Sequence, residues 1–109
     1  MQHLFVYGTL RPGYSNEHIM NTIGGEWHEA TIKGRYVKEG WGFDKYGLPA
    51  LVVDSEGQEI SGFVFSSENL EKHWTFLDDF EGSDYQRVET RATCANGDAI
   101  NVQVYALRR

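Results

Sequence analysis

Near its start the chain reads Leu4-Phe5-Val6-Tyr7-Gly8-Thr9-Leu10-Arg11-Pro12-Gly13. The unbroken apolar run at residues 4–7 predicts a buried strand, and Gly8 ends it. A polar loop follows as far as Asn16 and contains the turn pair Pro12-Gly13. The chain therefore begins with a buried strand that opens directly into a loop with few competing side chains.

Downstream of this loop, four more segments have the pattern of strands. Apolar residues form a short run or alternate with polar ones at residues 50–53, 60–65, 85–93 and 99–107. The last two segments flank Ala95-Asn96-Gly97-Asp98, and its Asn-Gly pair is a strong hairpin signal. Between residues 27 and 38 the pattern is mixed, and Gly40-Trp41-Gly42-Phe43 predicts a loop, so the layout of residues 26–60 stays open.

Helical spacing is clearest in the second half of the chain. Ser67 is a suitable N-cap for a helix from Glu68 to about Phe80, and Gly82 supplies its C-terminal stop. The apolar stripe of this helix consists of Leu70, His73, Trp74, Phe76, Leu77 and Phe80. A shorter helix that ends at Ile23 has a weaker pattern. Together the segments predict an α+β fold with a curled, mostly antiparallel sheet packed by one or two helices.

Length and charge restrict the class of protein. The chain has 109 residues, 40% of them hydrophobic, so we expect a single domain over residues 1–109. The 16 acidic and 10 basic residues give a net charge of −6, and the basic residues are scattered, which argues against nucleic acid as a partner. No apolar run approaches the roughly 20 residues that span a bilayer, so no membrane partner is expected. A single cysteine, Cys94, and the lack of a signal-peptide pattern favour a cytoplasmic location.

The first candidate site is the loop at Gly8, Thr9 and Leu10. A glycine-containing loop at the end of a buried strand can turn successive N–H groups towards one point and hold a carboxylate or an oxyanion. The loop is not a phosphate-binding P-loop, because the Gly-x-x-x-x-Gly-Lys spacing is absent. A tight turn at a strand end, without any function, explains the same residues.

The second candidate is Glu81, because its position combines three influences that raise a carboxyl pKa. It follows the negative end of the predicted helix, neighbouring acids add like charge, and flanking aromatic residues can exclude water. The acids are Asp78, Asp79 and Asp84, and the aromatic residues are Phe76, Phe80 and Tyr85. A carboxyl with a raised pKa can release and take back a proton near neutral pH, as a general acid–base must. A solvated acidic helix end is the alternative interpretation.

The remaining candidates are Tyr7, Tyr85 and Tyr105, each at the edge of a predicted strand. A buried tyrosine needs a partner for its hydroxyl, so several around one cavity could orient a small polar substrate. Ordinary core tyrosines are the alternative. The four histidines lack metal-ligand spacing and Cys94 has no histidine nearby, so we expect neither a metal site nor a thiol nucleophile.

Two segments together are more specific than either alone. They are Phe5-Val6-Tyr7-Gly8-Thr9-Leu10-Arg11-Pro12-Gly13 and Phe76-Leu77-Asp78-Asp79-Phe80-Glu81-Gly82-x-x-Tyr85-x-Arg87. This pair resembles the γ-glutamylcyclotransferase-like family, and in particular its short branch of γ-glutamylamine cyclotransferases and bacterial homologues. The resemblance covers essentially the whole chain, including the closing strand with Val104-Tyr105.

The resemblance implies a small α+β fold with a barrel-like sheet and a cavity at its mouth. The loop Tyr7-Gly8-Thr9-Leu10 matches the family's substrate loop, whose N–H groups grip the γ-glutamyl group. Glu81 matches the catalytic acid–base, and Tyr85 and Tyr105 match positions that line the pocket. The implied reaction is of the lyase or acyltransferase type: the substrate's own α-amine attacks the γ-carbonyl, which needs no protein nucleophile, metal or cofactor.

Two functional hypotheses follow. The first is a cyclotransferase that converts a γ-glutamyl amine, or a related small γ-glutamyl amide, into 5-oxoproline and a free amine. The alternative is a non-catalytic protein that binds γ-glutamyl compounds and retains the cavity. The identity of the leaving amine and the oligomeric state have no signature in the sequence.

Overall fold

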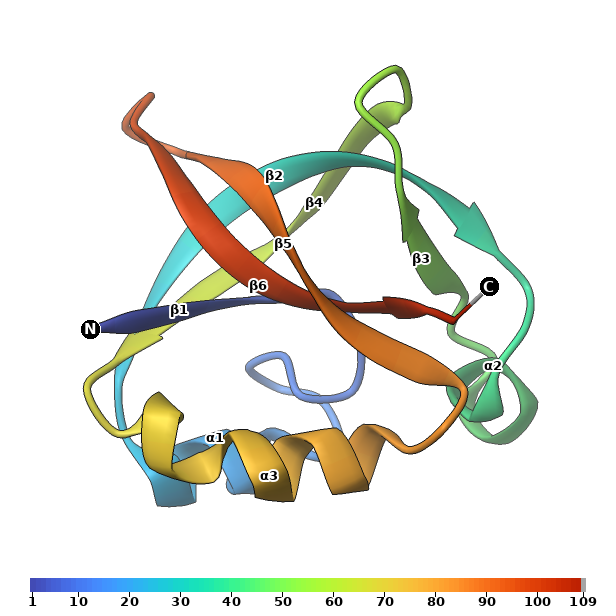
Figure 1. Cartoon of the computed structure of the whole chain (residues 1–109), viewed down its shortest axis with the longest axis horizontal. Helices are drawn as coiled ribbons and strands as arrows, with labels where there is room; N and C mark the ends of the chain where they lie inside the picture. Colours follow the sequence, from blue (N-terminus) through green and yellow to red (C-terminus); the bar gives the residue numbers. More distant parts are fainter. Residues whose placement is uncertain (109) are drawn as a thin grey trace.

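The chain alternates strands with short helices, as Figure 1 shows for the computed structural model, which describes residues 1–108. Within that range the predicted α+β class is confirmed by six strands and three helices. In chain order they are β1 (Gln2–Val6), α1 (Glu17–Ile23), β2 (Glu26–Val37), α2 (Trp41–Tyr46), β3 (Ala50–Val53), β4 (Gln58–Ser67), α3 (Leu70–Glu81), β5 (Tyr85–Cys94) and β6 (Ala99–Leu107).

Five strands close into a barrel in the order β2-β4-β1-β6-β5, because β5 pairs again with β2. β1 and β6 are parallel, whereas the other pairings are antiparallel, and β3 extends the sheet beside β2. β2 makes the closure possible, since it pairs with β4, with β5 through Ala30 and Thr31, and with β3 at its end. It arches over the barrel in Figure 1. The expected curled, mostly antiparallel, barrel-like sheet is confirmed.

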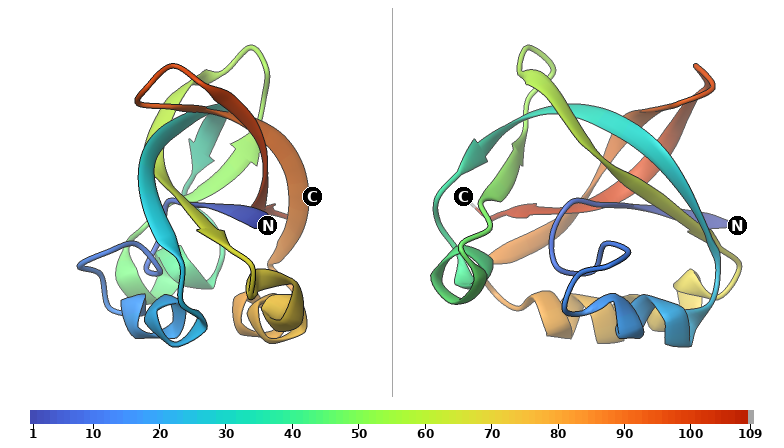
Figure 2. Two further views of the ribbon diagram at one scale, coloured as in Figure 1. Left: turned by 90° about the vertical axis from the view of Figure 1, so that its left-hand side faces the viewer. Right: turned by 180° about the vertical axis from the view of Figure 1, so that it is seen from behind.

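The first strand is buried on both faces, as its apolar run predicted. Phe5 belongs to the core inside the barrel together with Val64 and Val104. Leu4 and Val6 belong to a second core between the sheet and the helices. α1 and α3 lie on the same side of the barrel (Figure 2) and contribute Met20, Ile23, Leu70 and Leu77 to that second core. Because each face of β1 has its own core, the loop at the end of β1 starts from a firmly held strand.

The long helix is shifted slightly from its predicted limits. α3 begins at Leu70, because Ser67 makes a turn: its Oγ accepts the N–H of Asn69 at 3.0 Å and donates to the carbonyl of Gly24 at 2.6 Å. At the other end Gly82 has a φ of +79°, which favours glycine and ends the helix directly after Glu81. Phe76 was expected in the apolar stripe, but it is 54% exposed.

The loop predicted at residues 40–43 is wrong, because α2 (Trp41–Tyr46) forms there. Gly40 has a φ of +90°, and a Cβ on it would lie 2.5 Å from the hydroxyl oxygen of Tyr85. A Cβ on Gly42 would lie 3.1 Å from the same atom. The glycines therefore allow a helix to approach Tyr85 closely. Glycine is a poor helix former, so tertiary contacts rather than local preference form α2.

The weaker helix pattern that ends at Ile23 is confirmed as α1 (Glu17–Ile23), with Met20 and Ile23 buried. Asn16 precedes it but does not cap it with its side chain. Instead, the side-chain Nδ2 of Asn16 donates to Thr9 Oγ1 at 2.9 Å, which ties the start of the helix to the loop after β1. Of the helices in residues 1–108, none combines the length and apolarity needed to cross a membrane.

Candidate active site

One pocket forms where the loop after β1 meets α2, the end of α3, and strands β5 and β6. It encloses about 500 Å³ of space, its open mouth included. It is lined by Val6, Tyr7, Gly8, Thr9, Leu10, Trp41, Gly42, Leu48, Pro49, Glu81, Tyr85 and Tyr105. All seven residues singled out in the sequence belong to this lining, although they come from four separate segments of the chain.

In the loop after β1 the carbonyl groups accept hydrogen bonds from the protein, whereas the N–H groups at its start are left without acceptors in the described residues. The carbonyl of Gly8 accepts the N–H of Arg11 at 3.2 Å and Arg11 Nε at 3.0 Å. The carbonyl of Thr9 accepts the N–H of Asn16 at 2.9 Å. Among residues 1–108 no acceptor is found for the N–H groups of Gly8, Thr9 and Leu10. Three consecutive donors at the pocket wall are therefore available to a ligand with negative charge.

Glu81 is the last residue of α3, and its carboxyl group lies at the wall of the same pocket. Burial raises the pKa of Glu81 from 4.5 to about 7. No hydrogen bond to its side-chain oxygens is found within the described part of the chain. Its backbone carbonyl, in contrast, accepts Trp41 Nε1 at 2.5 Å. The backbone is thus held in place, and the carboxyl is free to exchange a proton near neutral pH.

The cause of the raised pKa differs from the sequence-based explanation. Like charge from Asp78 was expected to contribute, but burial alone accounts for the shift of Glu81. Asp78 instead accepts hydrogen bonds from Arg87 Nε at 3.0 Å and Tyr105 Oη at 2.6 Å. Phe76, expected to exclude water from Glu81, points to solvent. Trp41, which the sequence interpretation left out of the site, lines the pocket beside Glu81 instead.

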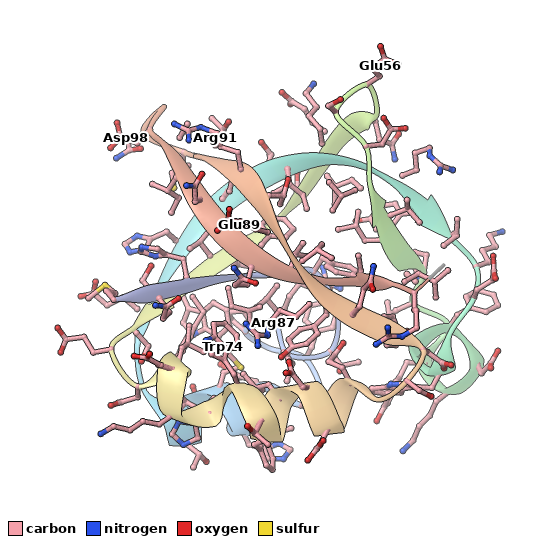
Figure 3. All side chains as sticks on the ribbon, viewed as in Figure 1. Glu56, Trp74, Arg87, Glu89, Arg91 and Asp98 are labelled. Atoms are coloured by element: carbon pink, nitrogen blue, oxygen red, sulfur yellow. The ribbon has the colours of Figure 1, made fainter. Side chains whose placement is uncertain are left out.

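The pair of Asp78 and Arg87 bridges α3 and β5 on the outside of the pocket. Arg87 also lies over the ring of Trp74, with its guanidinium carbon 4.3 Å from the ring centroid, as Figure 3 illustrates. Partial burial opposes ionisation of Asp78, but the hydrogen bonds from Arg87 and Tyr105 outweigh it and lower the pKa of Asp78. Asp78 is therefore an ionised structural group at neutral pH.

The three tyrosines present their rings to the pocket, but their hydroxyl groups already have protein partners. Tyr7 Oη donates to the carbonyl of Tyr105 at 2.6 Å and accepts the N–H of Leu51 at 3.2 Å, which joins β1, β6 and β3. Tyr105 Oη donates to Asp78, and Tyr85 Oη accepts the N–H of Gly42 at 3.2 Å. Burial raises the pKa of Tyr7, Tyr85 and Tyr105, so all three stay neutral. In residues 1–108 the Tyr85 hydroxyl has no acceptor for its own proton, so it can still donate to a ligand.

Sequence reasoning missed the side of the pocket that α2 builds. Trp41 closes that side: its ring meets Phe80 edge-on at 5.6 Å and Tyr85 at 6.3 Å between centroids. The backbone N–H of Trp41 donates to Asp84 Oδ2 at 2.9 Å, which anchors the start of α2 to the loop between α3 and β5. A tryptophan between two glycines was the available signal, because so large an apolar ring is rarely left in a free loop.

Comparison with known proteins places this geometry in a family context. The sequence model of a family described as "Gamma-glutamyl cyclotransferase, AIG2-like" matches residues 4–109. A rat protein named gamma-glutamylaminecyclotransferase is 31% identical over 120 residues, which span 97% of this chain and 78% of the rat protein. The match includes both segments that carry the candidate site.

Solved structures agree with the sequence matches. The crystal structure of an AIG2-like protein from Mus musculus has a TM-score of 0.71 at 27% identity, covering 97% of this chain and 76% of the mouse chain. The YkqA protein of Bacillus subtilis has a TM-score of 0.72 at 26% identity, covering 98% of this chain but 36% of its own. The barrel with its packed helices is thus shared across distant relatives.

Proposed function

Because this chain belongs to the γ-glutamyl cyclotransferase, AIG2-like family, we propose that it converts γ-glutamyl amides into 5-oxoproline and a free amine, with Glu81 as general acid–base. The family and the rat relative support γ-glutamyl cyclotransferase activity in general. The observation that carries the specific proposal is the carboxyl of Glu81, whose pKa is about 7, in one pocket with the open N–H groups of residues 8–10.

The substrate provides the nucleophile. Its α-amine attacks its own γ-carbonyl carbon, a C–N bond closes a five-membered ring, and the original amide C–N bond then breaks. Glu81 as a carboxylate takes a proton from the α-ammonium before attack. As a carboxylic acid it then gives a proton to the departing nitrogen. A pKa near the working pH suits both steps, because both forms of Glu81 are then populated.

The protons balance over the whole reaction. The α-ammonium loses two protons, one before attack and one from the tetrahedral intermediate, and the leaving nitrogen gains two to depart as an ammonium ion. Glu81 is the pocket group that can carry them one at a time, because its pKa is about 7, whereas burial raises the pKa of Tyr7, Tyr85 and Tyr105 and keeps their hydroxyls protonated.

The loop after β1 holds the substrate in its attacking shape. The N–H groups of Gly8, Thr9 and Leu10 bind negative charge, either the α-carboxylate or the oxyanion that forms on the γ-carbonyl oxygen. Holding amine and carbonyl within one pocket favours ring closure, because well-oriented intramolecular attack lowers the barrier by several kcal/mol.

The test is to supply the purified protein with several γ-glutamyl amides and measure 5-oxoproline. The wild type should form it, and Glu81→Gln should reduce kcat by about 100-fold or more, because proton transfer typically contributes that much. Asp79→Asn is the matched control: it removes a carboxyl from the exposed side of the same helix end and should keep full activity. Binding of these compounds without any 5-oxoproline would instead support the non-catalytic binding protein.

A further inference from the structure

A second hollow adjoins the pocket on the far side of Trp41. Trp41 and Glu81 line both hollows, so the two lie next to each other. The second hollow is completed by Asn16, Lys45, Tyr46, Phe80 and Gly82. We call these seven residues the α2–α3 groove. It is open to solvent and belongs to the helices rather than to the loop that would hold the γ-glutamyl group.

The walls of the α2–α3 groove are mainly aromatic. The Trp41 ring lies between Phe80 and Tyr46, with ring centroids 5.6 Å and 6.1 Å away in edge-to-face geometry. Tyr46 is 37% exposed, and Trp41 and Phe80 are only partly buried. These rings expose apolar surface to water, so a ligand that covers them binds more tightly. A flat ring fits such walls well.

Charge in the groove is divided between its two ends. Glu81 stands at the end shared with the pocket, and Lys45 stands in the last turn of α2, with Nζ 5.4 Å from the Tyr46 ring centroid. Of the described residues that line the groove, Lys45 is the single cation. An anionic group on a ligand is therefore favoured at the Lys45 end, and a second positive charge is disfavoured there.

Proton transfer determines which hollow receives the leaving group. The leaving nitrogen must come within hydrogen-bond reach of Glu81, so its substituent continues into a hollow that Glu81 borders. The other neighbouring hollow contains Asp78, Arg87 and Arg108 and shares Tyr85 and Tyr105 with the pocket, but Glu81 does not line it. Of these two hollows, the α2–α3 groove is the one that Glu81 lines.

We propose that the α2–α3 groove is the leaving-group subsite and that it selects aromatic amino acids, so the preferred substrates are γ-glutamyl aromatic amino acids. The aromatic ring lies against Trp41, Tyr46 and Phe80, and the carboxylate of the leaving amino acid faces Lys45. This inference rests on the proposed function, since it places the γ-glutamyl group in the pocket.

Binding to Glu81→Gln protein tests the subsite without turnover. Three probes are compared by calorimetry: γ-glutamylphenylalanine, γ-glutamyl-2-phenylethylamide, which lacks the carboxylate, and γ-glutamylmethylamide, which lacks both groups. We expect Kd to be about tenfold lower for γ-glutamylphenylalanine than for the methylamide, with the phenylethylamide between them, because covering a ring contributes at least that factor. Equal Kd values for the three probes would overturn the proposal.

Two variants separate the contributions of charge and ring. In the same background, Lys45→Ala should abolish the advantage of γ-glutamylphenylalanine over the phenylethylamide, and Tyr46→Ala should reduce the advantage of both over the methylamide. Lys72→Ala is the control, since it removes a similar exposed charge near the opposite end of α3. A loss as large in Lys72→Ala as in Lys45→Ala would contradict the assignment to the groove.

Wild-type turnover distinguishes this inference from the proposed function. Equal kcat/KM for all three probes would refute the subsite and leave the cyclotransferase proposal intact. If the Kd values follow the expected order but no probe yields 5-oxoproline, the cyclotransferase proposal is refuted and the groove remains a ligand site.

Discussion

Asp78 and Glu81 lie one helical turn apart at the end of α3, and their surroundings differ in the partners that each carboxyl meets. Asp78 is half-exposed and receives hydrogen bonds from Arg87 and Tyr105, which lower its pKa. Glu81 is enclosed by the pocket wall, and burial raises its pKa to about 7. The difference teaches that hydrogen-bond partners and burial, rather than the number of nearby acids, decide which carboxyl of an acidic cluster holds a proton.

The largest expected effect is the loss of folding stability when the buried carboxyl of Glu81 ionises. Its folded pKa of about 7 exceeds the ordinary 4.5, so stability is complete below pH 4.5 and is lost as the pH rises through 7. Since one pKa unit corresponds to about 1.4 kcal/mol, the loss is on the order of 3 kcal/mol. Glu81→Gln has no carboxyl to ionise, so it should not lose this stability. In urea denaturation its free energy of unfolding should exceed that of the wild type at pH 8.5 but not at pH 4. A stability difference independent of pH would contradict the assigned pKa.

The next effect tests Trp41 as the group that encloses Glu81. Trp41→Leu opens the pocket wall and removes the hydrogen bond to the Glu81 carbonyl. We expect the pKa of Glu81 to fall by about one unit towards its ordinary value. The midpoint of the pH profile of kcat/KM should then move to lower pH. Trp74→Leu is the matched control, because Trp74 packs on Arg87, the partner of Asp78, and should leave the midpoint in place.

A smaller effect concerns the hydroxyl that binds Asp78. Tyr105→Phe keeps the ring at the pocket wall but removes the 2.6 Å hydrogen bond to Asp78. The free energy of unfolding at neutral pH should fall by about 1.5 kcal/mol. This is the lower end of the usual range of about 1.5–3 kcal/mol for a hydrogen bond to a charged group, because Asp78 is partly exposed. Because the pKa of Asp78 is lowered, this contribution disappears as the pH falls through that pKa, and a carbon-13 NMR titration should show the pKa rising in the variant. An unchanged titration would show that the hydroxyl does not stabilise the carboxylate.

The smallest effect belongs to the ion pair of Arg87 and Asp78. The two side chains are partly exposed, with Arg87 Nε 3.0 Å from Asp78 Oδ1. Arg87→Gln should lower the free energy of unfolding by about 1 kcal/mol or less, and the difference should shrink in 1 M salt because exposed charges are screened. Denaturation curves at low and high salt provide the measurement. A larger loss that salt does not change would point to the contact with Trp74 as the main contribution.

Several features of the fold were predictable because they depend on neighbouring residues. The apolar run at 4–7 requires a strand buried on both faces, and Asn96-Gly97 closes the hairpin between β5 and β6, where Gly97 has a φ of +93°. Gly82 likewise ends α3, so the location of Glu81 at a helix end was foreseeable. These elements are set by local conformational preferences and apolar periodicity, which sequence alone displays.

Other features depend on residues far apart in the chain. α2 contains a glycine and lies against Tyr85, so its helical form arises from contacts across more than forty positions of sequence, such as the bond from Gly42 to Tyr85. The hydroxyl of Tyr7 binds β6 and β3 rather than facing a ligand, which the residue type does not reveal. The raised pKa of Glu81 was expected, but like charge was wrongly expected to contribute to it.

The sequence by itself determined which residues are available for chemistry at this site: the loop at 8–10, a glutamate at a helix end, and a family pattern that joins them. Their arrangement depends on the closed barrel, which brings the end of β1, α2 and the end of α3 together at one pocket. There Glu81 is enclosed, whereas Asp78 accepts hydrogen bonds from Arg87 and Tyr105. The physical reason is that desolvation and hydrogen bonding depend on distances of a few ångströms between segments, and such distances exist only once the chain has folded.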